Sequence, residues 1–438
     1  MTQAIKIGLE IHVAIPTKTK LFCSCSAYNE HEPNMSVCPI CMGFPGSKPM
    51  LNAKALEIAK SVANALHSDI AKTVSFERKV YFYPDLPKSF QITQLSNPVS
   101  QGGFIELQSS KRIRIRRIQI EEDPAKILHE EDYSLIDFNR SGRPLLEIVT
   151  EPDIFNIDEL KEFMNELKSI LYYLGIDINT ELKADVNVSN QGERVEIKNI
   201  TGLKDMINAA LFEIKRQETA RASGLVINKE TRSYDEAKIA TMPMREKETD
   251  EEYGIIYEPD LGNYSIENIP IIEPVYASKI AKELAEEYSA SEKLIIEQIM
   301  FDRNALQFIN KFAGTHKINI VISAIEVLKR YNKTLDEYKF EALLTAISKN
   351  VLINSETINA IEQGKAIEAS SEIDENLIDS AINSMILENK QLLKDYRKNS
   401  KVFNFVIGQI AKKYNASPKY ISTRLNILLP KFVAGKED

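Results

Sequence analysis

Strict alternation of apolar residues marks the beginning of the chain. In the stretch IKIGLEIHVAI, residues 5–15, every second residue is apolar. This period of two predicts a β-strand with one buried face, because successive side chains of a strand point to opposite sides. The opposite face carries Glu10 and His12, which lie about 7 Å apart along an extended backbone. The two side chains can therefore reach one metal ion or one substrate, although an ordinary solvated face has the same pattern.

Other alternating stretches predict further strands, and helical patterns lie between them. The strands are IRIRRIQI (113–120, with a slip at Arg116–Arg117), KADVNVS (183–189) and RVEIKNI (194–200). The helices are NAKALEIAKSVANALHS (52–68) and IDELKEFMNELKSILYYLG (157–175), the second ending at a glycine suited to a C-cap. Runs of strands with helices between them indicate an α+β domain on an antiparallel sheet.

Beyond about residue 275 the patterns are helical to the end of the chain. They are SKIAKELAEEY, SEKLIIEQIMFD, DEYKFEALLTAISKNV, ENLIDSAINSMILEN, KVFNFVIGQIAKKY and PKYISTRLNILL. A length of 438 residues exceeds what one hydrophobic core supports. We therefore expect an α+β domain over residues 1–288, a helical domain over 289–366 and a helical tail over 367–438.

Composition narrows the class of protein. The chain is 43% hydrophobic and 27% charged, which is typical of a globular protein. No apolar run reaches the length of a membrane span, and the N-terminus lacks the apolar core of a signal peptide. We therefore expect a cytoplasmic protein with no membrane association, whose four cysteines are reduced or bound to metal. The chain contains neither a P-loop nor a dinucleotide-binding motif.

Charge is distributed unevenly. The formal net charge is −8, but residues 386–438 contain eleven Lys or Arg and only four Asp or Glu. The tail thus carries +7, and the first 385 residues carry −15. An acidic body with a basic tail suggests that only the tail contacts an anionic partner.

All four cysteines fall within residues 21–46. They form the two close pairs Cys23–Cys25 and Cys38–Cys41, with twelve residues between the pairs. This spacing favours a structural Zn²⁺ site, in which four thiolates leave no open position for chemistry. Buried thiols without metal are the alternative, and His31 is a candidate substitute ligand.

Several carboxylates occupy unusual positions. Glu147 lies in the apolar run 145–149, where an ionised carboxylate is costly unless it is paired or bound to metal. QIEEDPAK (119–126) contains three acids in succession, and Asp185 lies on the outward face of its predicted strand. Such oxygen ligands suit Mg²⁺, provided that the strands are neighbours. Side chains that simply point into solvent are the alternative.

Between Ile5 and Leu261 the chain contains, in this order, the motifs GLEIHV, EPNMSVCPICMGFPGSKPMLN, RKVYFYPDLPKSFQITQ, EEDPAK, YSLIDFNRSGRPLLEIVTEPD, ADVNVS, EIKNI, ETRSYDEAK, MREKE and EPDL. These motifs and their order resemble those of one family, the B subunits of tRNA-dependent amidotransferases (GatB/GatE). The stretch LLKDYRKNSKVFNFVIGQIAKK (392–413) is similar to its YqeY-like tail. The resemblance implies a catalytic cradle domain with a zinc-binding loop at 21–46, then a helical domain, then a helical tail.

The resemblance also implies a reaction. The partners would be an amidase subunit, GatA, and a small subunit, GatC, and the substrates Glu-tRNA(Gln), Asp-tRNA(Asn) or both. This subunit would use ATP and Mg²⁺ to phosphorylate the side-chain carboxylate carried by the tRNA. Ammonia released by GatA from glutamine or asparagine would then displace the phosphate.

Site residues follow from the matching motifs. The implied Mg²⁺ ligands are Glu10, His12, Glu122 and Glu147. The other implied catalytic residues are Lys79, as a phosphate contact, Asp185 and Lys198. The basic tail is expected to bind the tRNA body through Lys394, Arg397, Lys398, Lys401, Lys412 and Lys413, with a solvated helix face as the alternative.

Some motifs depart from the family pattern. Gln119 stands where the family often has His, Val80 replaces a usual Asn, EEDPAK replaces EEDAGK, and GIIYEPD replaces RYFPEPD. A non-catalytic tRNA-binding scaffold that kept the fold is therefore the second hypothesis. The four implied Mg²⁺ ligands are all present, which favours catalysis. A free-standing zinc-containing RNA-binding protein would have a basic body, which this chain lacks.

Overall fold

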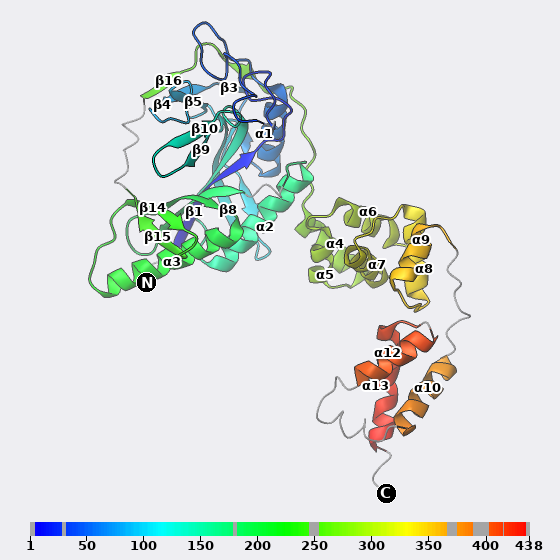
Figure 1. Ribbon diagram of the computed structural model, residues 1–438. Helices are drawn as coiled ribbons and strands as arrows, with labels where there is room; N and C mark the ends of the chain where they lie inside the picture. The colour runs from blue at the N-terminus through cyan, green and yellow to red at the C-terminus, as the bar shows by residue number, and fades with distance from the viewer. Residues whose placement is uncertain are drawn as a thin grey trace. The chain divides into compact units, whose positions relative to one another are not determined.

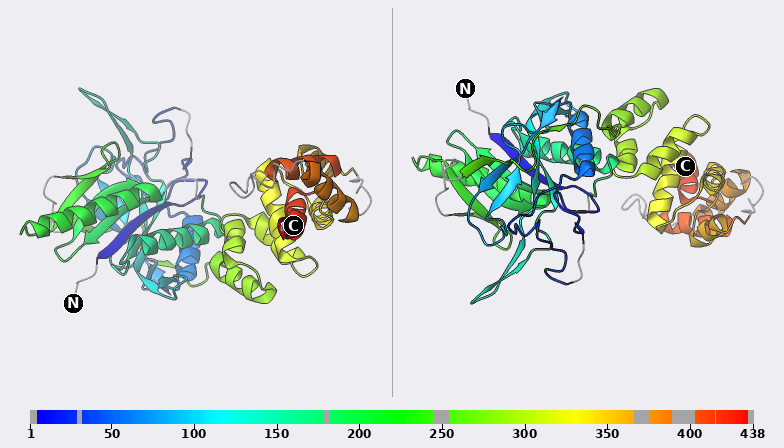
Figure 2. Two further views of the ribbon diagram at one scale, coloured as in Figure 1. Left: turned by 90° about the horizontal axis from the view of Figure 1, so that it is seen from below. Right: turned by 90° about the horizontal axis from the view of Figure 1, so that it is seen from above.

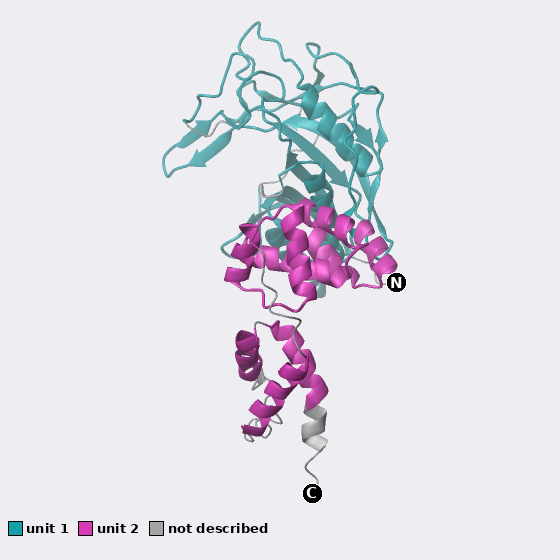
Figure 3. Ribbon diagram, turned by 90° about the vertical axis from the view of Figure 1, so that its right-hand side faces the viewer, with its two compact units in different colours: residues 1–278 teal, residues 279–438 magenta. Residues whose placement is uncertain are grey.

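The structure is a computed structural model, and its chain forms two compact units, residues 1–278 and 279–438 (Figure 1, Figure 3). The structure describes residues 5–28, 32–177, 182–244, 254–365, 375–388, 403–414 and 416–434. Each unit is described separately below.

A large, mostly antiparallel sheet organises the first unit. Its strands, in spatial order, are β15 (Ala240–Pro243), β14 (Glu230–Asp235), β13 (Val195–Thr201), β12 (Lys183–Ser189), β1 (Lys6–Ala14), β11 (Pro144–Thr150), β8 (Arg112–Glu122), β6 (Ser100–Gln101) and β2 (Asp69–Ile70), with β7 (Phe104–Glu106) paired to β8. Only the β13–β14 pair is parallel among these. The predicted α+β class with an antiparallel sheet is confirmed.

One face of this sheet forms the core. Along β1, Ile7, Leu9, Ile11 and Val13 are almost fully buried, as the alternation predicted. The helices that pack against the apolar face are α1 (Ala53–Ala65), α2 (Ile157–Tyr173) and α3 (Leu203–Ala222) (Figure 1, Figure 2). The opposite face of β1 therefore carries the remaining, polar positions, including Glu10 and His12.

Helix α2 begins and ends where its sequence signals lie. The side chain of Asn156 accepts a hydrogen bond from the backbone N–H of Glu159, at 2.9 Å. This cap satisfies a donor that the first turn would leave unpaired. After the helix, Gly175 has a φ of +88°, a conformation that glycine adopts without steric cost.

Helix α3 was not predicted. Its inner face carries Glu213 and Gln217, both fully buried, where apolar residues would mark the helical period. The Glu213 carboxylate is hydrogen-bonded by Arg216, Gln217 and Thr241. This buried polar network interrupts the apolar pattern by which an amphipathic helix is identified.

Three small sheets complete the first unit. They are β16 (Gly254–Tyr257) with β4 (Glu77–Val80) and β5 (Phe90–Thr93), the hairpin of β9 (Lys126–His129) with β10 (Ser134–Asp137), and β3 (Thr73–Val74) with β17 (Tyr264–Ser265). Strands β4 and β5 are joined by a loop that contains Pro84 and Pro87.

The described elements of the second unit are helices, as predicted. They are α4 (Ala277–Tyr288, which begins in the first unit), α5 (Glu292–Ile299), α6 (Arg303–Phe312), α7 (Ile318–Tyr331), α8 (Glu337–Ser348), α9 (Ser355–Glu362), α10 (Glu375–Glu388), α12 (Phe403–Tyr414) and α13 (Pro418–Ala434). Helices α10, α12 and α13 share a hydrophobic cluster of their own. No helix in the described part of the chain combines the length and apolarity needed to cross a membrane.

A β-bulge between β8 and β11 accounts for the slip in the alternation at Arg116–Arg117. Val149 pairs with Arg117 but Thr150 pairs with Ile115, so Arg116 is the extra residue. The hydroxyl of Thr150 accepts a hydrogen bond from the backbone N–H of Leu9, at 2.9 Å in a buried setting. Next to the bulge, the side chain of Thr150 thus ties β11 to β1.

Thr150→Val is expected to destabilise the fold by about 1–3 kcal/mol, because the isosteric methyl leaves the Leu9 N–H buried without an acceptor. Denaturant unfolding followed by circular dichroism measures the change. Thr73→Val, at an exposed strand position, is the matched control and should change stability by less than about 0.5 kcal/mol. Equal stability of the Thr150→Val variant and the unmutated chain would contradict this role.

Candidate functional site

The polar face of the large sheet gathers carboxylates from five strands. Side chains directly opposite one another on antiparallel strands lie on the same face. His12 lies opposite Glu147 on β11, which lies opposite Gln119 on β8. On the other side, Glu10 lies opposite Asp185 on β12.

Three of these side chains form a compact cluster. His12 Nε2 lies 3.6 Å from Glu121 Oε1 and 4.0 Å from Glu147 Oε2. The two glutamates are about one-tenth exposed, whereas His12 is 26% exposed and gives the cluster access to solvent. One ligand atom from each residue lies within 4.8 Å of the others. An imidazole and two carboxylates at this separation fit a divalent cation that keeps some of its water ligands.

Glu147 is oriented by its neighbours on β8. Gln119 Nε2 donates to Glu147 Oε2 at 3.1 Å, and Arg117 Nε donates to Gln119 Oε1 at 2.8 Å. A terminal nitrogen of Arg117 also lies 3.5 Å from Glu147 Oε1. Gln119, which stands where the family often has His, thus holds a carboxylate of the cluster in place.

A second group of acids lies beside the first. Ligand atoms of Glu10, Asp185 and Glu196 lie within 4.8 Å of one another. The Lys198 ammonium is 2.5 Å from Asp185 Oδ2 and 2.6 Å from Glu196 Oε1. Because this lysine already neutralises charge there, the His12–Glu121–Glu147 cluster is the better site for a divalent cation. Asn187 donates to Glu10 at 3.4 Å, while its buried Oδ1 has no hydrogen-bond partner among the described residues.

Electrostatic effects are strong on this face. Burial, with repulsion from Glu121, raises the pKa of Glu147 above its ordinary value, although His12, Arg117 and Lys79 oppose the shift. Burial, with repulsion from Glu147 and Asp185, likewise raises the pKa of Glu10. The nearby positive side chains therefore do not fully compensate the charge of these carboxylates, and a bound cation would do so.

Lys198 belongs to this face, whereas Lys79 lies on β4 of a small separate sheet, opposite Gln91 of β5. Burial opposes the charge of the Lys198 ammonium, but the carboxylates of Asp185 and Glu196 outweigh it and raise the pKa of the lysine. The positive charge of Lys79 contributes to lowering the pKa of Glu147, against the larger effect of burial. The structure thus brings together on this face five of the seven residues that the resemblance assigned: Glu10, His12, Glu147, Asp185 and Lys198.

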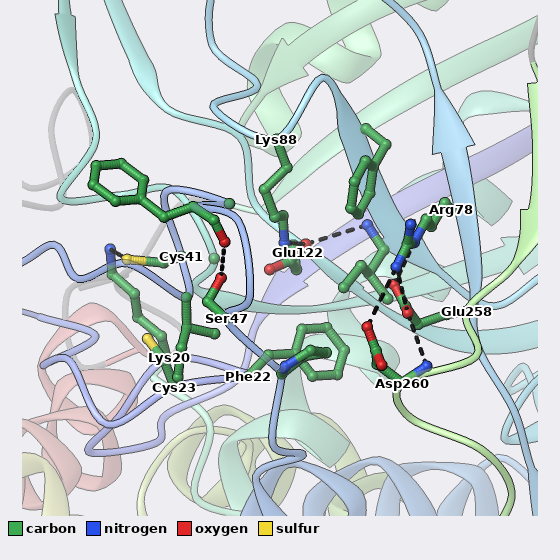
Figure 4. A pocket seen from close by; sticks show the side chains of 17 residues that line it. Lys20, Phe22, Cys23, Cys41, Ser47, Arg78, Lys88, Glu122, Glu258 and Asp260 are labelled. Carbon is green, nitrogen blue, oxygen red and sulfur yellow. Dashed lines mark hydrogen bonds and ion pairs between the residues drawn. The ribbon is translucent and has the colours of Figure 1, made fainter.

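Glu122 is the other exception. It forms an ion pair with Lys88 (Figure 4) and accepts a hydrogen bond from the backbone N–H of Ile92, at 3.2 Å. By the alternation of β8 it points away from the face that carries Glu121. Among the described residues, Glu121 is the neighbouring acid whose carboxylate lies beside His12 and Glu147. The sequence itself indicates that Glu121 lies on the polar face. In IQIEE (118–122), Ile118 and Ile120 are buried in the core, so residues 119 and 121 share the opposite, polar face.

Glu122, Lys88 and two of the cysteines line a separate cavity of about 170 Å³ (Figure 4). Arg78, which extends toward this cavity, pairs with Glu258 at 2.7 Å and with Asp260 at 3.7 Å. Glu258 and Asp260 belong to the divergent GIIYEPD segment. The positive groups of the cavity at Arg78 and Lys88 therefore already have carboxylate partners.

The four cysteines come together as their spacing predicted. Each sulfur lies within 4.8 Å of the other three. A hydrogen bond from Cys23 and the nearby positive charge of Lys20 lower the pKa of Cys41 to about 5, while the same shared hydrogen bond raises that of Cys23. Since a thiolate is the form that binds metal, four thiol groups at this separation fit a tetrahedral zinc ion. His31 lies outside the described residues.

Of the tail residues, Lys412 and Lys413 lie in the last turn of α12 and are exposed. The hollow that they border is formed with α10. Lys394, Arg397, Lys398 and Lys401 lie outside the described residues.

Glu121→Gln and Glu147→Gln are each expected to weaken Mn²⁺ binding at least about tenfold, because each removes a charged ligand. Mn²⁺ replaces Mg²⁺ as a probe, and the electron paramagnetic resonance of free Mn²⁺ measures the titration. Glu122→Gln is the matched control and should bind Mn²⁺ within about twofold of the unmutated chain. Loss of binding in Glu122→Gln but not in Glu121→Gln would contradict this site.

Mn²⁺ affinity is also expected to fall as the pH is lowered, beginning above the ordinary carboxyl value of 4.5. The folded pKa of Glu147, a proposed ligand, is raised, and so is that of Glu10 beside the cluster, so protons compete with the cation at a higher pH than they would for ordinary carboxylates. The same titration at successive pH values measures the effect. Affinity that stays constant down to pH 4.5 would show that Glu147 is not a ligand.

Comparison with known proteins agrees with the resemblance seen in the motifs. Residues 5–271 match the GatB/GatE catalytic domain. The chain is 38% identical to the B subunit of an aspartyl/glutamyl-tRNA(Asn/Gln) amidotransferase from Sulfolobus acidocaldarius, covering 93% of this chain and 96% of that protein. The B subunit from Methanospirillum hungatei is 33% identical over 98% of both chains. The chain therefore belongs to the GatB/GatE family and is related, along almost its whole length, to the B subunits of tRNA-dependent amidotransferases.

Proposed function

We propose that this chain binds misacylated tRNA and phosphorylates the side-chain carboxylate of its glutamyl or aspartyl group with ATP and Mg²⁺. The observation that carries the proposal is the cluster of His12, Glu121 and Glu147 on the polar face of the sheet. In a relative of amidotransferase B subunits, this is the group of described side chains better suited to a hard divalent cation such as Mg²⁺ than the neighbouring acids around Lys198.

The chemistry explains the need for ATP. A free carboxylate resists ammonia because it would have to expel an oxide. Transfer of the γ-phosphoryl group from ATP to a carboxylate oxygen gives an acyl phosphate and ADP. Ammonia then attacks the acyl carbon, and inorganic phosphate leaves to give the side-chain amide. The first step requires the two reactants to be aligned and the phosphate charge to be neutralised.

Each residue of the site would have a separate role in this phosphoryl transfer. A divalent cation, when bound, neutralises phosphate charge, and His12, Glu121 and Glu147 would hold it. Gln119 and Arg117 keep Glu147 oriented. Lys79 would contact a phosphate. Lys198, held between Asp185 and Glu196, keeps a fixed positive charge on the same face.

Two further subunits would complete the enzyme in the cytoplasm. GatA would release ammonia from glutamine or asparagine, so that the enzyme acts as a carbon–nitrogen ligase, and GatC would complete the heterotrimer. The basic tail, including the exposed Lys412 and Lys413, would bind phosphates of the tRNA body. The four cysteines would hold a structural Zn²⁺ that orders residues 21–46.

In the complex reconstituted with GatA and GatC, Glu147→Gln is expected to lower tRNA-dependent release of ADP at least about a hundredfold, because the cation loses a ligand. Assays on Glu-tRNA(Gln) and Asp-tRNA(Asn) in parallel also identify the substrate. Glutaminase activity should be unaffected, since another subunit provides it.

The matched control is Glu151→Gln, just beyond the end of β11, where the carboxylate pairs with the exposed Arg116. This variant should release ADP at the rate of the unmutated complex. Undiminished ADP release by Glu147→Gln would contradict phosphorylation at this cluster and favour a scaffold role for the chain.

A further inference from the structure

Lys20 is a fully buried lysine beside the cysteine cluster. Its side chain is 0% exposed and is among the largest that the fold encloses. Its ammonium lies 3.1 Å from the backbone oxygen of Phe138 and 3.8 Å from Cys41 Sγ (Figure 4). It therefore lies between the cysteine loop and the turn that precedes β11.

The environment of this ammonium lacks an ordinary counter-ion. Among the described residues, no carboxylate oxygen lies within 4.0 Å of it. Its one oxygen acceptor among the described residues is a carbonyl, which supplies a dipole and no full charge, so burying the ammonium there is costly. The nearest described group that can carry a negative charge is the Cys41 sulfur, at 3.8 Å.

A metal bound by the four cysteines would carry the complementary charge. Zn²⁺ with four thiolates has a formal charge of −2, which is itself costly to bury. We propose that Lys20 is the counter-ion of this metal centre: its ammonium neutralises half of that charge and donates to Cys41. Lys20 is thus a positioning residue that raises the metal affinity of the cysteine cluster.

The same lysine connects the metal centre to the strand that carries Glu147. The backbone N–H of Lys20 donates to Cys25, and that of Leu21 to Gly142, at 2.9 and 2.8 Å. Gly142 has a φ of +83°, and a Cβ built there would lie 3.5 Å from Lys20 Cδ and 3.8 Å from Cys41 Cβ. The cysteine loop, Lys20 and the turn at Gly142 therefore pack as one unit, two residues ahead of β11.

Lys20→Met tests the proposal, with Lys20→Arg as the charge-retaining variant and the exposed Lys18→Met as the matched control. Zinc is measured by competition with a colorimetric chelator on the full-length chain. Lys20→Met is expected to lower zinc affinity at least about tenfold, as the loss of residues that support metal ligands commonly does. Lys20→Arg and Lys18→Met should remain within about threefold of the unmutated chain.

Unchanged zinc affinity in Lys20→Met would overturn the proposal. An equal loss in Lys20→Arg would overturn it as well, since side-chain shape and not charge would then matter. If Lys20→Met is unfolded as purified, excess zinc should restore its circular dichroism, because mass action compensates for weaker binding. Failure to fold at any zinc concentration would assign Lys20 a purely structural role and refute its part in metal binding.

Discussion

Antiparallel pairing of β1 with β11 and β12 is the constraint on which the rest of the first unit depends. One register buries Ile7, Leu9 and Ile11 in the core and, by the same alternation, places Glu10 and His12 on the other face. A shift of one residue would reverse both faces at once. The core and the site are therefore two consequences of a single set of backbone hydrogen bonds.

The polar face of the sheet carries negative charge that the nearby cations do not fully compensate, and a bound metal cation can compensate it. Glu121 and Glu147 are nearly buried, and burial together with repulsion from Glu121 raises the pKa of Glu147. Lys198 relieves this repulsion around Asp185 and Glu196, whereas around Glu147 the nearby cations only reduce it. This uncompensated negative charge destabilises the folded chain. It also increases the affinity of the face for a metal cation, because the carboxylates are concentrated in a small space.

The sequence predicted regular features of the fold and missed those made by buried polar groups. Alternation identified β1 and β12, and the cysteine spacing identified the sulfur cluster. Helix α3 was missed because Glu213, hydrogen-bonded by Arg216 of the same helix and by Thr241 of β15, breaks its apolar pattern. Family motifs suggested Glu122 where alternation within the same strand indicates Glu121. The burial of Lys20 could not be predicted from the sequence, because it depends on a turn more than a hundred residues away.

The most direct test of the central claim is anomalous X-ray diffraction from crystals soaked in Mn²⁺. The account predicts a peak bounded by His12, Glu121 and Glu147, with Gln119 contacting the carboxylate of Glu147 and not the ion. A peak at Glu122, or no peak on the polar face of the sheet in crystals that bind Mn²⁺ elsewhere, would contradict it.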